Sequence, residues 1–282
     1  MTTGSAGAAR RCGVLGDPIA HSLSPVLHRA GYAELGLDWE YDAHRVPSGG
    51  LADFLAGVDA LWRGLSLTMP LKREALDLVD RLTDRARLAG AVNTLLLEPD
   101  GTRVGDNTDL PGAAAALRER TTMPLASAAI LGGGATATSV GLALVDLGVT
   151  TVELLVRDEA RAGETVAALR AHPAGVDVRV TSLGGGAPVV ADVVVSTIPA
   201  DAQTGDLVAR CAQVPVVFEA LYDPWPTPLA ASALSTDRVL VGGLDLLVHQ
   251  AVLQFELFTG LPAPLGAMRA AGADALAGRS HA

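Results

Sequence analysis

Aromatic residues are scarce in this sequence: they make up 4% of its 282 residues, whereas hydrophobic residues as a whole make up 49%. The core must therefore be built mainly from alanine, valine and leucine. Small side chains of this kind suit helices that pack closely on a sheet, as in the layers of α/β proteins. The length is enough for two domains or for one large one.

Positive charge is also scarce, because 21 Lys and Arg residues stand against 31 Asp and Glu residues, which gives a net charge of -10. This balance argues against a nucleic-acid partner and against an anionic membrane surface. An anionic ligand would have to be held by local features of its binding site, and not by the general field of the protein.

Cysteine is limited to Cys12 and Cys211. Two cysteines in a chain of this size do not form a disulfide framework, so a reducing compartment is expected. Residues 1–11 contain no apolar run after their charges and do not read as a secretory signal. No uninterrupted apolar stretch reaches the length that spans a membrane. We therefore expect a cytoplasmic protein with no membrane partner.

Short apolar runs alternate with helical patterns along the chain, which is typical of a mostly parallel sheet covered by helices. In the first part of the chain, strands are expected at 11–15, 39–46, 64–68 and 91–98, and helices at 25–35, 51–58 and 71–82. In the second part, strands are expected at 128–131, 152–156, 176–180, 191–196, 214–218 and 238–242, and helices at 110–120, 136–147 and 159–169.

This pattern predicts a two-domain α/β fold. The first domain spans 1–110. The second, 111–242, has the rhythm of a doubly wound nucleotide-binding domain. Two further helices, expected at 244–258 and 264–277, lie within the last segment, 243–282. Because they follow the last strand, we expect them to pack back on the first domain.

A glycine-rich loop in the second domain follows a short apolar strand and precedes a helix. Gly132, Gly134 and Ala137 fit the G-x-G-x-x-G/A spacing of dinucleotide-binding loops. The first glycine permits the tight turn and the second lets the backbone approach a pyrophosphate, while Ala137 permits close helix–strand packing. A flexible loop is the alternative, but the flanking strand and helix favour a nucleotide site.

The end of the next strand carries the cofactor preference. Arg157 follows this strand directly and Arg161 comes four residues later, a spacing that lets both reach a 2′-phosphate. Asp158 is the competing signal, because a carboxylate there could bind ribose hydroxyls as in NAD sites. The two arginines favour NADP. The alternative is an exposed helix start that Asp158 caps and in which the arginines are solvated.

Lys72 closes the stretch GLSLTMPLK, residues 64–72, where a predicted strand passes into a predicted helix. Thr68 and Pro70 resemble a helix N-cap and first turn. Lys72 would then lie in the first turn, where the helix dipole opposes a positive charge. Catalytic groups collect at such strand–helix junctions. The alternative is a solvated helix start.

Hydroxyl and amide side chains follow or interrupt other predicted strands. Ser24 resembles an N-cap with Pro25 at the first helical position, and simple capping explains Ser24 but not Ser22. Two hydroxyls beside free helix N–H groups would make a carboxylate site. Asn93 interrupts an apolar strand, which is costly unless its amide is hydrogen-bonded. Asp109 precedes a helix and would by itself be read as a capping residue.

Several motifs together resemble the shikimate dehydrogenase family. They are GDPIAHSLSP (16–25), LTMPLK (67–72), GAVNT (90–94), GDNTD (105–109), LGGGATA (131–137) and GGLDLLVHQA (242–251). YDPWPTP (222–228) is similar to the actinobacterial branch in particular. The resemblance runs from about Cys12 to Met268 with the motifs in family order, which is far more specific than any one motif.

The resemblance implies an enzyme, an NADP-dependent oxidoreductase that reduces 3-dehydroshikimate to shikimate with NADPH. The reaction belongs to the chorismate pathway of aromatic amino-acid biosynthesis. The implied fold is a substrate-binding domain and a Rossmann domain with the active site in the cleft between them. The partner is a small-molecule substrate, no metal is implied, and a homodimer is compatible with these expectations.

The resemblance also implies roles for individual positions. Lys72 and Asp109 match the catalytic lysine and aspartate; Asp109 could orient Lys72, bind a substrate hydroxyl or share the proton. The matching substrate-binding residues are Ser22 and Ser24 for the carboxylate, Thr68, Asn93 and Gln250 for the ring hydroxyls, and Tyr222 in the pocket lining. The matching cofactor-binding residues are Gly132, Gly133, Gly134, Ala135, Thr136, Arg157, Arg161, Thr197 and Gly243.

Some positions depart from the family pattern. Asp158 adds a negative charge where a threonine is frequent, which would weaken a preference for NADP. Leu246 stands where a methionine is common, and Glu219 where an aspartate is frequent. Asp245 stands where a small or uncharged residue is usual, and the sequence assigns it no role.

Two other functions compete with shikimate dehydrogenation. Quinate or aminoshikimate dehydrogenation on the same scaffold would depend on the pocket at Ser22 and Ser24, and two serines favour shikimate. A non-catalytic module that senses shikimate-like acids would be expected to lose Lys72 or Asp109, or to carry a basic DNA-binding extension. Both residues are present and the sequence has no such extension.

Overall fold

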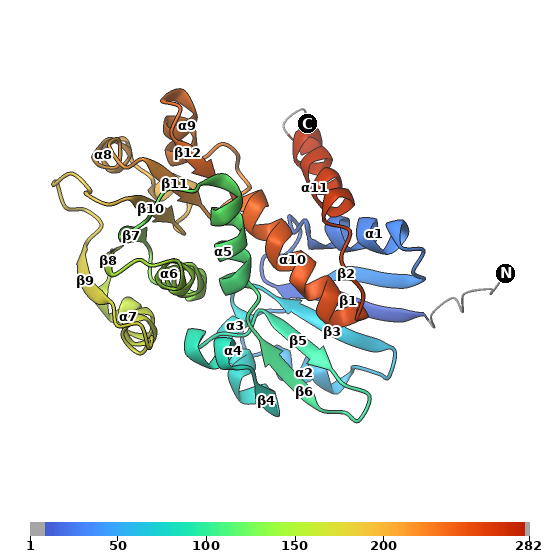
Figure 1. Ribbon diagram of the computed structural model, residues 1–282. Coiled ribbons are helices and arrows are strands. Elements are labelled where there is room, and N and C mark those ends of the chain that lie inside the picture. The colour runs from blue at the N-terminus through green and yellow to red at the C-terminus, as the bar shows by residue number, and fades with distance from the viewer. Residues whose placement is uncertain (1–8, 280–282) are drawn as a thin grey trace. The chain divides into compact units, whose positions relative to one another are not determined.

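The computed structural model describes residues 9–279, without the side chain of Arg161 (Figure 1). The chain forms two compact units. The first unit comprises Met1–Arg87, Ala91–Thr108 and Leu247–Ala282, and the second comprises Leu88–Gly90 and Asp109–Leu246. The helix α10 (Gly243–Thr259) therefore begins in the second unit and continues in the first.

The first unit contains a six-stranded mixed sheet in the order β2-β1-β3-β5-β6-β4. β1, β2 and β3 are parallel, β5 runs antiparallel to β3, and β6 runs antiparallel to β5. The strands are β1 (Arg10–Gly16), β2 (Trp39–Arg45), β3 (Trp62–Leu67), β4 (Arg81–Leu82), β5 (Thr94–Leu97) and β6 (Arg103–Asp106). The helices are α1 (Ser24–Glu34), α2 (Leu51–Ala56), α3 (Leu71–Glu74), the 3-10 helix η1 (Ala75–Leu78), α4 (Asp84–Ala89) and α11 (Leu265–Arg279), with α10.

The few aromatic residues are concentrated in the first unit. Tyr32, Tyr41, Phe255 and Phe258 are almost completely buried there. A Cβ atom on Gly64 would come within 2.1 Å of the Phe258 ring, so this ring lies directly on strand β3. Large rings thus fasten α1 and α10 to the sheet, and small residues in the strand make room for them.

The second unit contains a six-stranded, fully parallel sheet in the order β12-β11-β10-β7-β8-β9. Numbered within the unit, this is the 3-2-1-4-5-6 order of dinucleotide-binding domains. The strands are β7 (Ser127–Leu131), β8 (Thr151–Val156), β9 (Asp177–Ser182), β10 (Val193–Ser196), β11 (Val216–Glu219) and β12 (Val239–Val241). The helices are α5 (Asp109–Arg120), α6 (Ala135–Asp146), η2 (Glu159–Ala162), α7 (Gly163–Arg170), η3 (Ala200–Ala202), α8 (Gly205–Arg210) and α9 (Pro228–Ser235).

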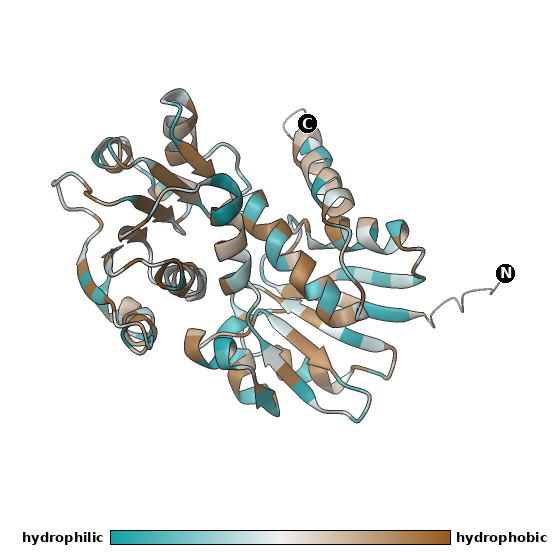
Figure 2. Ribbon diagram, in the orientation of Figure 1, coloured by the Kyte–Doolittle hydropathy of each residue, from teal (hydrophilic) through white to brown (hydrophobic). Residues whose placement is uncertain are grey.

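The strands of the second sheet are buried on both faces, which explains their continuous apolar sequences. Ala128 and Ile130 of β7 pack into the core cluster that contains residues of α5, α6 and α7, whereas Ala129 and Leu131 pack into the cluster with residues of α8 and α9. This alternation is the two-residue period of a strand. Figure 2 shows the central strands of this sheet coloured as strongly hydrophobic.

The predicted α/β class and the parallel nucleotide-binding sheet agree with the structure, but some elements differ. The helix expected at 71–82 was wrong: α3 and η1 end at Leu78, and the chain becomes extended at Val79, with φ -113° and ψ 147°. Asp80 N–H then donates to Arg103 O at 2.9 Å, which starts the pairing of β4 with β6. The short helices α4, α8 and α9 were not predicted.

Candidate active site

The ends of four strands bring several of the predicted substrate residues to one edge of the first sheet, whereas Tyr222 belongs to the second unit. β1 and β3 are parallel, so the segments after Gly16 and Leu67 leave the sheet at the same edge. Because β5 is antiparallel to β3, its start at Thr94 lies at that edge as well, as does the end of β6 at Asp106. Ligands of open α/β sheets bind outside the carboxyl ends of the parallel strands, which is this edge.

The segments after β1 and β3 are held against each other by backbone contacts. Thr68 N–H donates to Leu15 O at 2.9 Å, and Asp17 N–H donates to Met69 O at 2.9 Å. A Cβ atom on Gly16 would lie 2.3 Å from Thr68 Cγ2, so only glycine allows this approach. The loop that leads to the two serines is therefore fixed beside the loop that leads to Lys72.

At the start of α1, it is the hydroxyl of Ser22, and not that of Ser24, that bonds to a helix N–H group. Ser24 is the first residue of α1 and Leu23 occupies the N-cap position, so the expectation that Ser24 caps the helix was wrong. Instead, Ser22 Oγ accepts a hydrogen bond from Ser24 N–H at 3.3 Å. The one-residue shift places the hydroxyl of Ser22 at the start of α1, an eleven-residue helix whose N-terminal N–H groups favour an anion.

Lys72 is the second residue of the four-residue helix α3. Thr68 and Pro70 were expected to be the N-cap and first turn, and this was wrong, since α3 begins at Leu71 with Pro70 in the N-cap position. The Lys72 backbone carbonyl accepts a hydrogen bond from Val92 N–H at 2.7 Å. This bond ties the short helix to the segment that carries Asn93.

Lys72 is also the only lysine in the sequence: of the 21 basic residues, one is lysine and 20 are arginine. Arginine keeps its proton at every accessible pH, whereas lysine can release one. Apart from its six histidines, the chain therefore has one basic side chain that can release a proton, and it stands at position 72. This compositional signal can be read from the sequence alone.

Asn93 lies just before β5, and its side chain is the centre of a buried hydrogen-bonded cluster. Asn93 Oδ1 accepts from Thr108 N–H at 2.7 Å and from Thr94 Oγ1 at 2.8 Å. Asn93 Nδ2 donates to Thr108 Oγ1 at 2.9 Å and to Gln250 Oε1 at 3.4 Å. Gln250 Nε2 donates in turn to Leu247 O at 2.9 Å. The cost of burying these amides is thereby offset.

Asp106 has a structural role in the GDNTD motif. It is 2% exposed and accepts hydrogen bonds from Arg85 at 2.6 and 2.5 Å and from Thr83 Oγ1 at 2.7 Å. Burial alone would raise the pKa of Asp106, but the bonds from Arg85 and Thr83 hold that pKa below its ordinary value. Asp109, three residues later, is buried at the start of α5. The ion pair therefore fixes the strand end from which Asp109 follows.

The glycine-rich loop of the second unit lies where the strand order reverses, between β7 and β10. Gly132 has a φ of +109°, and a Cβ atom there would come within 2.4 Å of Thr197 Oγ1. Thr197 follows β10, and both its N–H and its hydroxyl donate to Leu131 O, at 3.0 and 2.9 Å. Gly132 and Thr197 therefore lie side by side at the position where dinucleotides bind in this fold.

The rest of the loop has the properties of a pyrophosphate cradle. Gly134 is extended at the N-cap of α6, and a Cβ atom there would meet no heavy atom within 4 Å, so the backbone is open to a ligand. Ala135 and Thr136 begin α6, and Ala137 is completely buried against the sheet. Gly133 O accepts from Thr165 Oγ1 at 2.9 Å, which holds the loop on α7. These residues fit a bound dinucleotide.

The end of β8 carries the residues that were expected to select the cofactor. Arg157 is exposed directly after the strand. Asp158 caps η2, since its Oδ1 accepts from Ala160 N–H at 3.0 Å. One carboxylate oxygen of Asp158 is thus engaged by the backbone, as the capping alternative had it. The side chain of Arg161 lies outside the described residues.

The start of α10 explains Asp245, to which the sequence assigned no role. Asp245 accepts two hydrogen bonds from Arg120 at 2.7 and 3.1 Å and one from Gly242 N–H at 2.9 Å. It therefore caps α10 and joins it to the end of α5. A Cβ atom on Gly243 would lie 2.4 Å from Leu221 O, so the helix start also packs on the backbone beside Tyr222.

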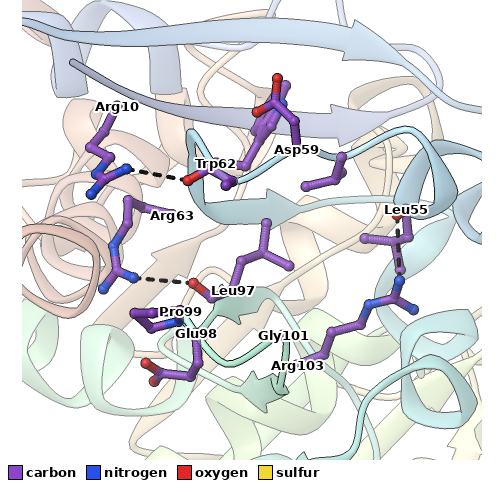
Figure 3. Close-up of a pocket in the computed structure, with 12 residues that line it drawn as sticks. Arg10, Leu55, Asp59, Trp62, Arg63, Leu97, Glu98, Pro99, Gly101 and Arg103 are labelled. Carbon is purple, nitrogen blue, oxygen red and sulfur yellow. Dashed lines mark hydrogen bonds between the residues drawn. The ribbon is translucent and has the colours of Figure 1, made fainter. Parts of the chain in front are cut away.

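A pocket of about 500 Å³ lies at the opposite end of the first sheet (Figure 3). Its lining includes Arg10 and Trp62 at the starts of β1 and β3, and Arg103 at the start of β6. Arg10, Arg63 and Arg103 donate there to backbone carbonyls (Figure 3). None of the predicted site residues lines this pocket, so the predicted chemistry belongs to the other edge.

Two searches of the described residues bear on metals and membranes. Within residues 9–279, no group of three or more His, Cys, Asp or Glu side chains could hold a metal ion. No helix in the same part of the chain is long and apolar enough to cross a membrane. Cys12 and Cys211 are both buried and unpaired.

Comparison with known proteins gives consistent matches. Residues 14–95 match the model of the shikimate dehydrogenase substrate binding domain, and 243–271 match that of the shikimate 5'-dehydrogenase C-terminal domain. A shikimate dehydrogenase (NADP(+)) of Methylobacterium radiotolerans is 38% identical over 279 residues, covering 90% of this chain and 92% of the relative.

Two solved structures extend the comparison to the fold. The Mycobacterium tuberculosis shikimate dehydrogenase superposes with a TM-score of 0.86 at 41% identity, covering 94% of this chain and 99% of the other. A quinate dehydrogenase of Corynebacterium glutamicum, solved with NAD, superposes with a TM-score of 0.84 at 27% identity, covering 94% and 99%.

Proposed function

Because the chain belongs to the shikimate dehydrogenase family, we propose that it interconverts 3-dehydroshikimate and shikimate with NADP(H), in aromatic amino-acid biosynthesis. One observation carries the proposal. A single edge of the first sheet gathers paired serine hydroxyls, a buried amide cluster around Asn93, and the only lysine of the chain. These are the groups needed to bind a carboxylate, bind ring hydroxyls and protonate a carbonyl oxygen.

The substrate is bound by neutral donors and acceptors. Ser22 and Ser24 take its carboxylate at the start of α1, where helix N–H groups stabilise a negative charge without a cation. Thr68, Asn93 and Gln250 take the ring hydroxyls, and Tyr222 lines the pocket. An uncharged carboxylate subsite of this kind would bind its anion in a chain whose net charge is -10.

The chemistry is the reduction of a ketone to an alcohol. NADPH, when bound, supplies the hydride to the carbonyl carbon. Lys72 donates a hydrogen bond to the carbonyl oxygen, stabilises the alkoxide as it develops and gives it a proton. Asp109, at the start of α5, is the second proposed catalytic residue. In the oxidation of shikimate the same lysine accepts the hydroxyl proton.

The second unit holds the dinucleotide. Gly132, Gly133 and Gly134 let the backbone approach the pyrophosphate, and the N–H groups of Ala135 and Thr136 begin α6 beside it. Arg157 and Arg161 bind the 2′-phosphate. Asp158, engaged as a cap, opposes them less than a free carboxylate would. Thr197 and Gly243 complete the cofactor contacts.

The decisive experiment is an assay of the purified chain at the nicotinamide absorbance. Shikimate with NADP should give the highest kcat/KM, with slower turnover for NAD and for quinate. Faster oxidation of quinate would favour the second candidate function, quinate dehydrogenation. The likeness to the Corynebacterium glutamicum quinate dehydrogenase supports this candidate. Binding of shikimate without any NADP-dependent absorbance change would instead indicate the non-catalytic module.

The single lysine offers an independent test of the site. An amine-reactive ester can acylate only Lys72 and the chain's α-amino group. Saturating shikimate should slow acylation of Lys72, measured by peptide mass spectrometry, and leave labelling of the α-amino group unchanged. Equal labelling with and without shikimate would contradict contact between Lys72 and the substrate.

A homodimer is a separate prediction. Light scattering of the purified chain tests it.

A further inference from the structure

A buried amide that the proposed mechanism does not use lies one helical turn beyond Gln250. Gln254 of α10 is 1% exposed. It stands four residues after Gln250, so both side chains lie on the same face of the helix. A glutamine is rarely buried so deeply unless its amide is fully hydrogen-bonded.

The amide of Gln254 makes a hydrogen bond with each of its polar hydrogens and with its oxygen. Gln254 Nε2 donates to the backbone carbonyl of Asn93 at 3.0 Å and to Thr94 Oγ1 at 2.9 Å. Gln254 Oε1 accepts from Ser66 Oγ at 2.7 Å. Gln254 therefore bonds to the backbone of Asn93 and to the hydroxyl that bonds the Asn93 side chain.

The direction of these bonds is fixed from one end. Tyr41 is completely buried, and its hydroxyl donates to Ser66 Oγ at 2.5 Å. The Ser66 hydroxyl can then give its own hydrogen to Gln254 Oε1, which leaves Gln254 Nε2 to face Thr94. Because Thr94 accepts from Gln254, it is free to donate to Asn93 Oδ1, as the 2.8 Å contact shows.

The consequence is a defined orientation of the Asn93 amide. Its oxygen faces three donors, the Thr94 hydroxyl, Thr108 N–H and, at 3.2 Å, the Thr108 hydroxyl, and its nitrogen faces Thr108 Oγ1 and Gln250 Oε1. A flipped Asn93 would bring its NH₂ group against the Thr108 N–H donor. The Asn93–Gln250 contact, at 3.4 Å, is the longest of the set and therefore the easiest for a ligand hydroxyl to replace.

We infer that Gln254 is a positioning residue, which through Thr94 turns the Asn93 amide so that its NH₂ group donates to a ring hydroxyl of the substrate. The inference rests on the proposed function. In this arrangement Asn93 is a donor and Gln250 Oε1 an acceptor at the same hydroxyl. The site then recognises a group that can both accept and donate, as a hydroxyl does and a hydrogen atom does not.

Gln254→Met keeps the length of the side chain and removes both donors and the acceptor. We expect KM for shikimate to rise about 10-fold, the value of one neutral hydrogen bond, while KM for NADP and kcat stay within about three-fold of wild type. Ser66→Ala is a milder second variant, which leaves Gln254 in place but removes its hydroxyl donor. It should raise KM for shikimate less, in the same direction.

Phe255→Leu is the matched control, because it alters a buried neighbour on the same helix without touching the polar network. It should lower the free energy of unfolding in urea and leave KM for shikimate unchanged. If Gln254→Met behaves like this control, Gln254 only packs and the inference fails. If the wild-type chain does not oxidise shikimate at all, the proposed function fails before the inference is tested.

The affinity for singly deoxygenated shikimates distinguishes a positioning role of Gln254 from a role in packing alone. For one of them, the wild-type enzyme should lose about 10-fold in affinity relative to shikimate. Gln254→Met should show no further loss with that analogue, since the donor orientation is already gone. Losses that add in full for every analogue would overturn the positioning role.

Discussion

The two units recognise their ligands with different parts of the chain. At the edge of the first sheet, side-chain amides and hydroxyls bond to one another, as in the cluster of Asn93, Thr108 and Gln250. At the corresponding edge of the second sheet, glycine backbone lies on an apolar core: Gly132 packs closely on Thr197, and Gly134 is open. Under the proposed function, substrate specificity in the first unit would therefore depend on polar pairing, and cofactor binding in the second on the small size of glycine.

This difference between the units predicts whether a substitution should alter the kinetics for the substrate or those for NADP. A changed polar group in the first unit should alter recognition of the substrate or the proton transfer, with little effect on NADP. An added methyl group in the cofactor loop should do the reverse. Kinetics that resolve KM for each ligand can therefore test the division of labour between the units.

The largest effect is expected at Lys72. Lys72→Met should lower kcat by about 10²-fold or more, because general acid catalysis and alkoxide stabilisation are lost together. KM for both ligands should change by less than about three-fold, since the loss falls mainly on the transition state. Steady-state kinetics in both directions would measure it.

Lys72→Arg separates the two contributions of the lysine. Arginine keeps the positive charge but does not release its proton. If proton transfer is essential, kcat should remain low in this variant. Recovery of wild-type kcat by Lys72→Arg would show that charge alone suffices and would remove Lys72 as the acid.

His28 should give the first unit a marked sensitivity to acid. Its ring is completely buried and stacked on Tyr41 at 4.1 Å between centroids. Among the described residues neither ring nitrogen has a partner in good hydrogen-bond geometry, although the Gln254 side chain lies close enough to oppose part of the effect of burial on the pKa. Burial lowers the pKa of His28 from 6.5 to about 3. Below pH 6.5, His28 therefore binds a proton in the unfolded chain but stays neutral in the folded chain. The free energy of unfolding falls for this reason as the pH drops toward 3.

Urea unfolding of wild type and His28→Phe measures this effect. Between pH 8 and pH 5, wild type should lose about 2 kcal/mol more stability than the variant, given that one unit of pKa shift is worth about 1.4 kcal/mol. Phenylalanine retains the stacking on Tyr41 and cannot titrate. Parallel pH profiles for the two proteins would exclude His28 as the source of the acid sensitivity.

The cofactor loop offers a pair of glycines with different expected costs. Gly132→Ala places a Cβ at φ +109° and 2.4 Å from Thr197 Oγ1, so it should lower stability by about 1–2 kcal/mol or more. It should also raise KM for NADP. Gly134→Ala meets no protein atom within 4 Å, so it should leave stability nearly unchanged and raise KM for NADP about 10-fold by crowding the pyrophosphate.

Shikimate binding is the internal control for both glycine variants. Because most of the predicted substrate residues lie in the first unit and neither glycine is one of them, the affinity for shikimate without cofactor should match wild type. A large loss of shikimate affinity in Gly134→Ala would contradict the separation of the two recognition modes.

The sequence predicted the second unit better than the first because its features are local. The spacing of Gly132, Gly134 and Ala137 and the apolar strands fall within short windows. The first unit depends on pairs that are distant along the chain: Arg85 with Asp106, 21 residues apart, and Ser66 with Gln254, 188 apart. Nothing near Gln254 marks it, since its partners are contributed by other strands.

The same limit explains the individual errors. The helix expected at 71–82 breaks because Asp80 pairs with Arg103, a contact no local pattern contains. Asp245 lacked a role because Arg120 lies 125 residues away. Ser24 differed by one residue, the usual uncertainty of a helix end. The one lysine among 21 basic residues needed no structure at all, only a count of lysine apart from arginine.

The smallest effect is expected from Glu219, the buried carboxylate of the second unit. It is completely buried at the end of β11 and accepts from Gln203 Nε2 at 2.8 Å, Thr227 Oγ1 at 2.7 Å and Leu221 N–H at 3.1 Å. Burial raises its pKa, although these three donors oppose the shift. The folded chain holds this proton more tightly than the unfolded chain, so the stability it contributes is present below pH 4.5 and is lost as the pH rises through the folded pKa.

The sign is opposite to that of His28, so these two buried groups, one in each unit, respond to pH in opposite directions. Glu219→Gln removes this titration. The free energy of unfolding of the variant should therefore change less between pH 4.5 and neutral pH than that of wild type. The slope is the measurement, since glutamine also places an NH₂ group against Leu221 N–H at one oxygen position, or against Gln203 and Thr227 at the other, and lowers stability at every pH. A slope identical to wild type would mean that the three donors keep Glu219 ionised throughout, and the contrast between the units would then rest on His28 alone.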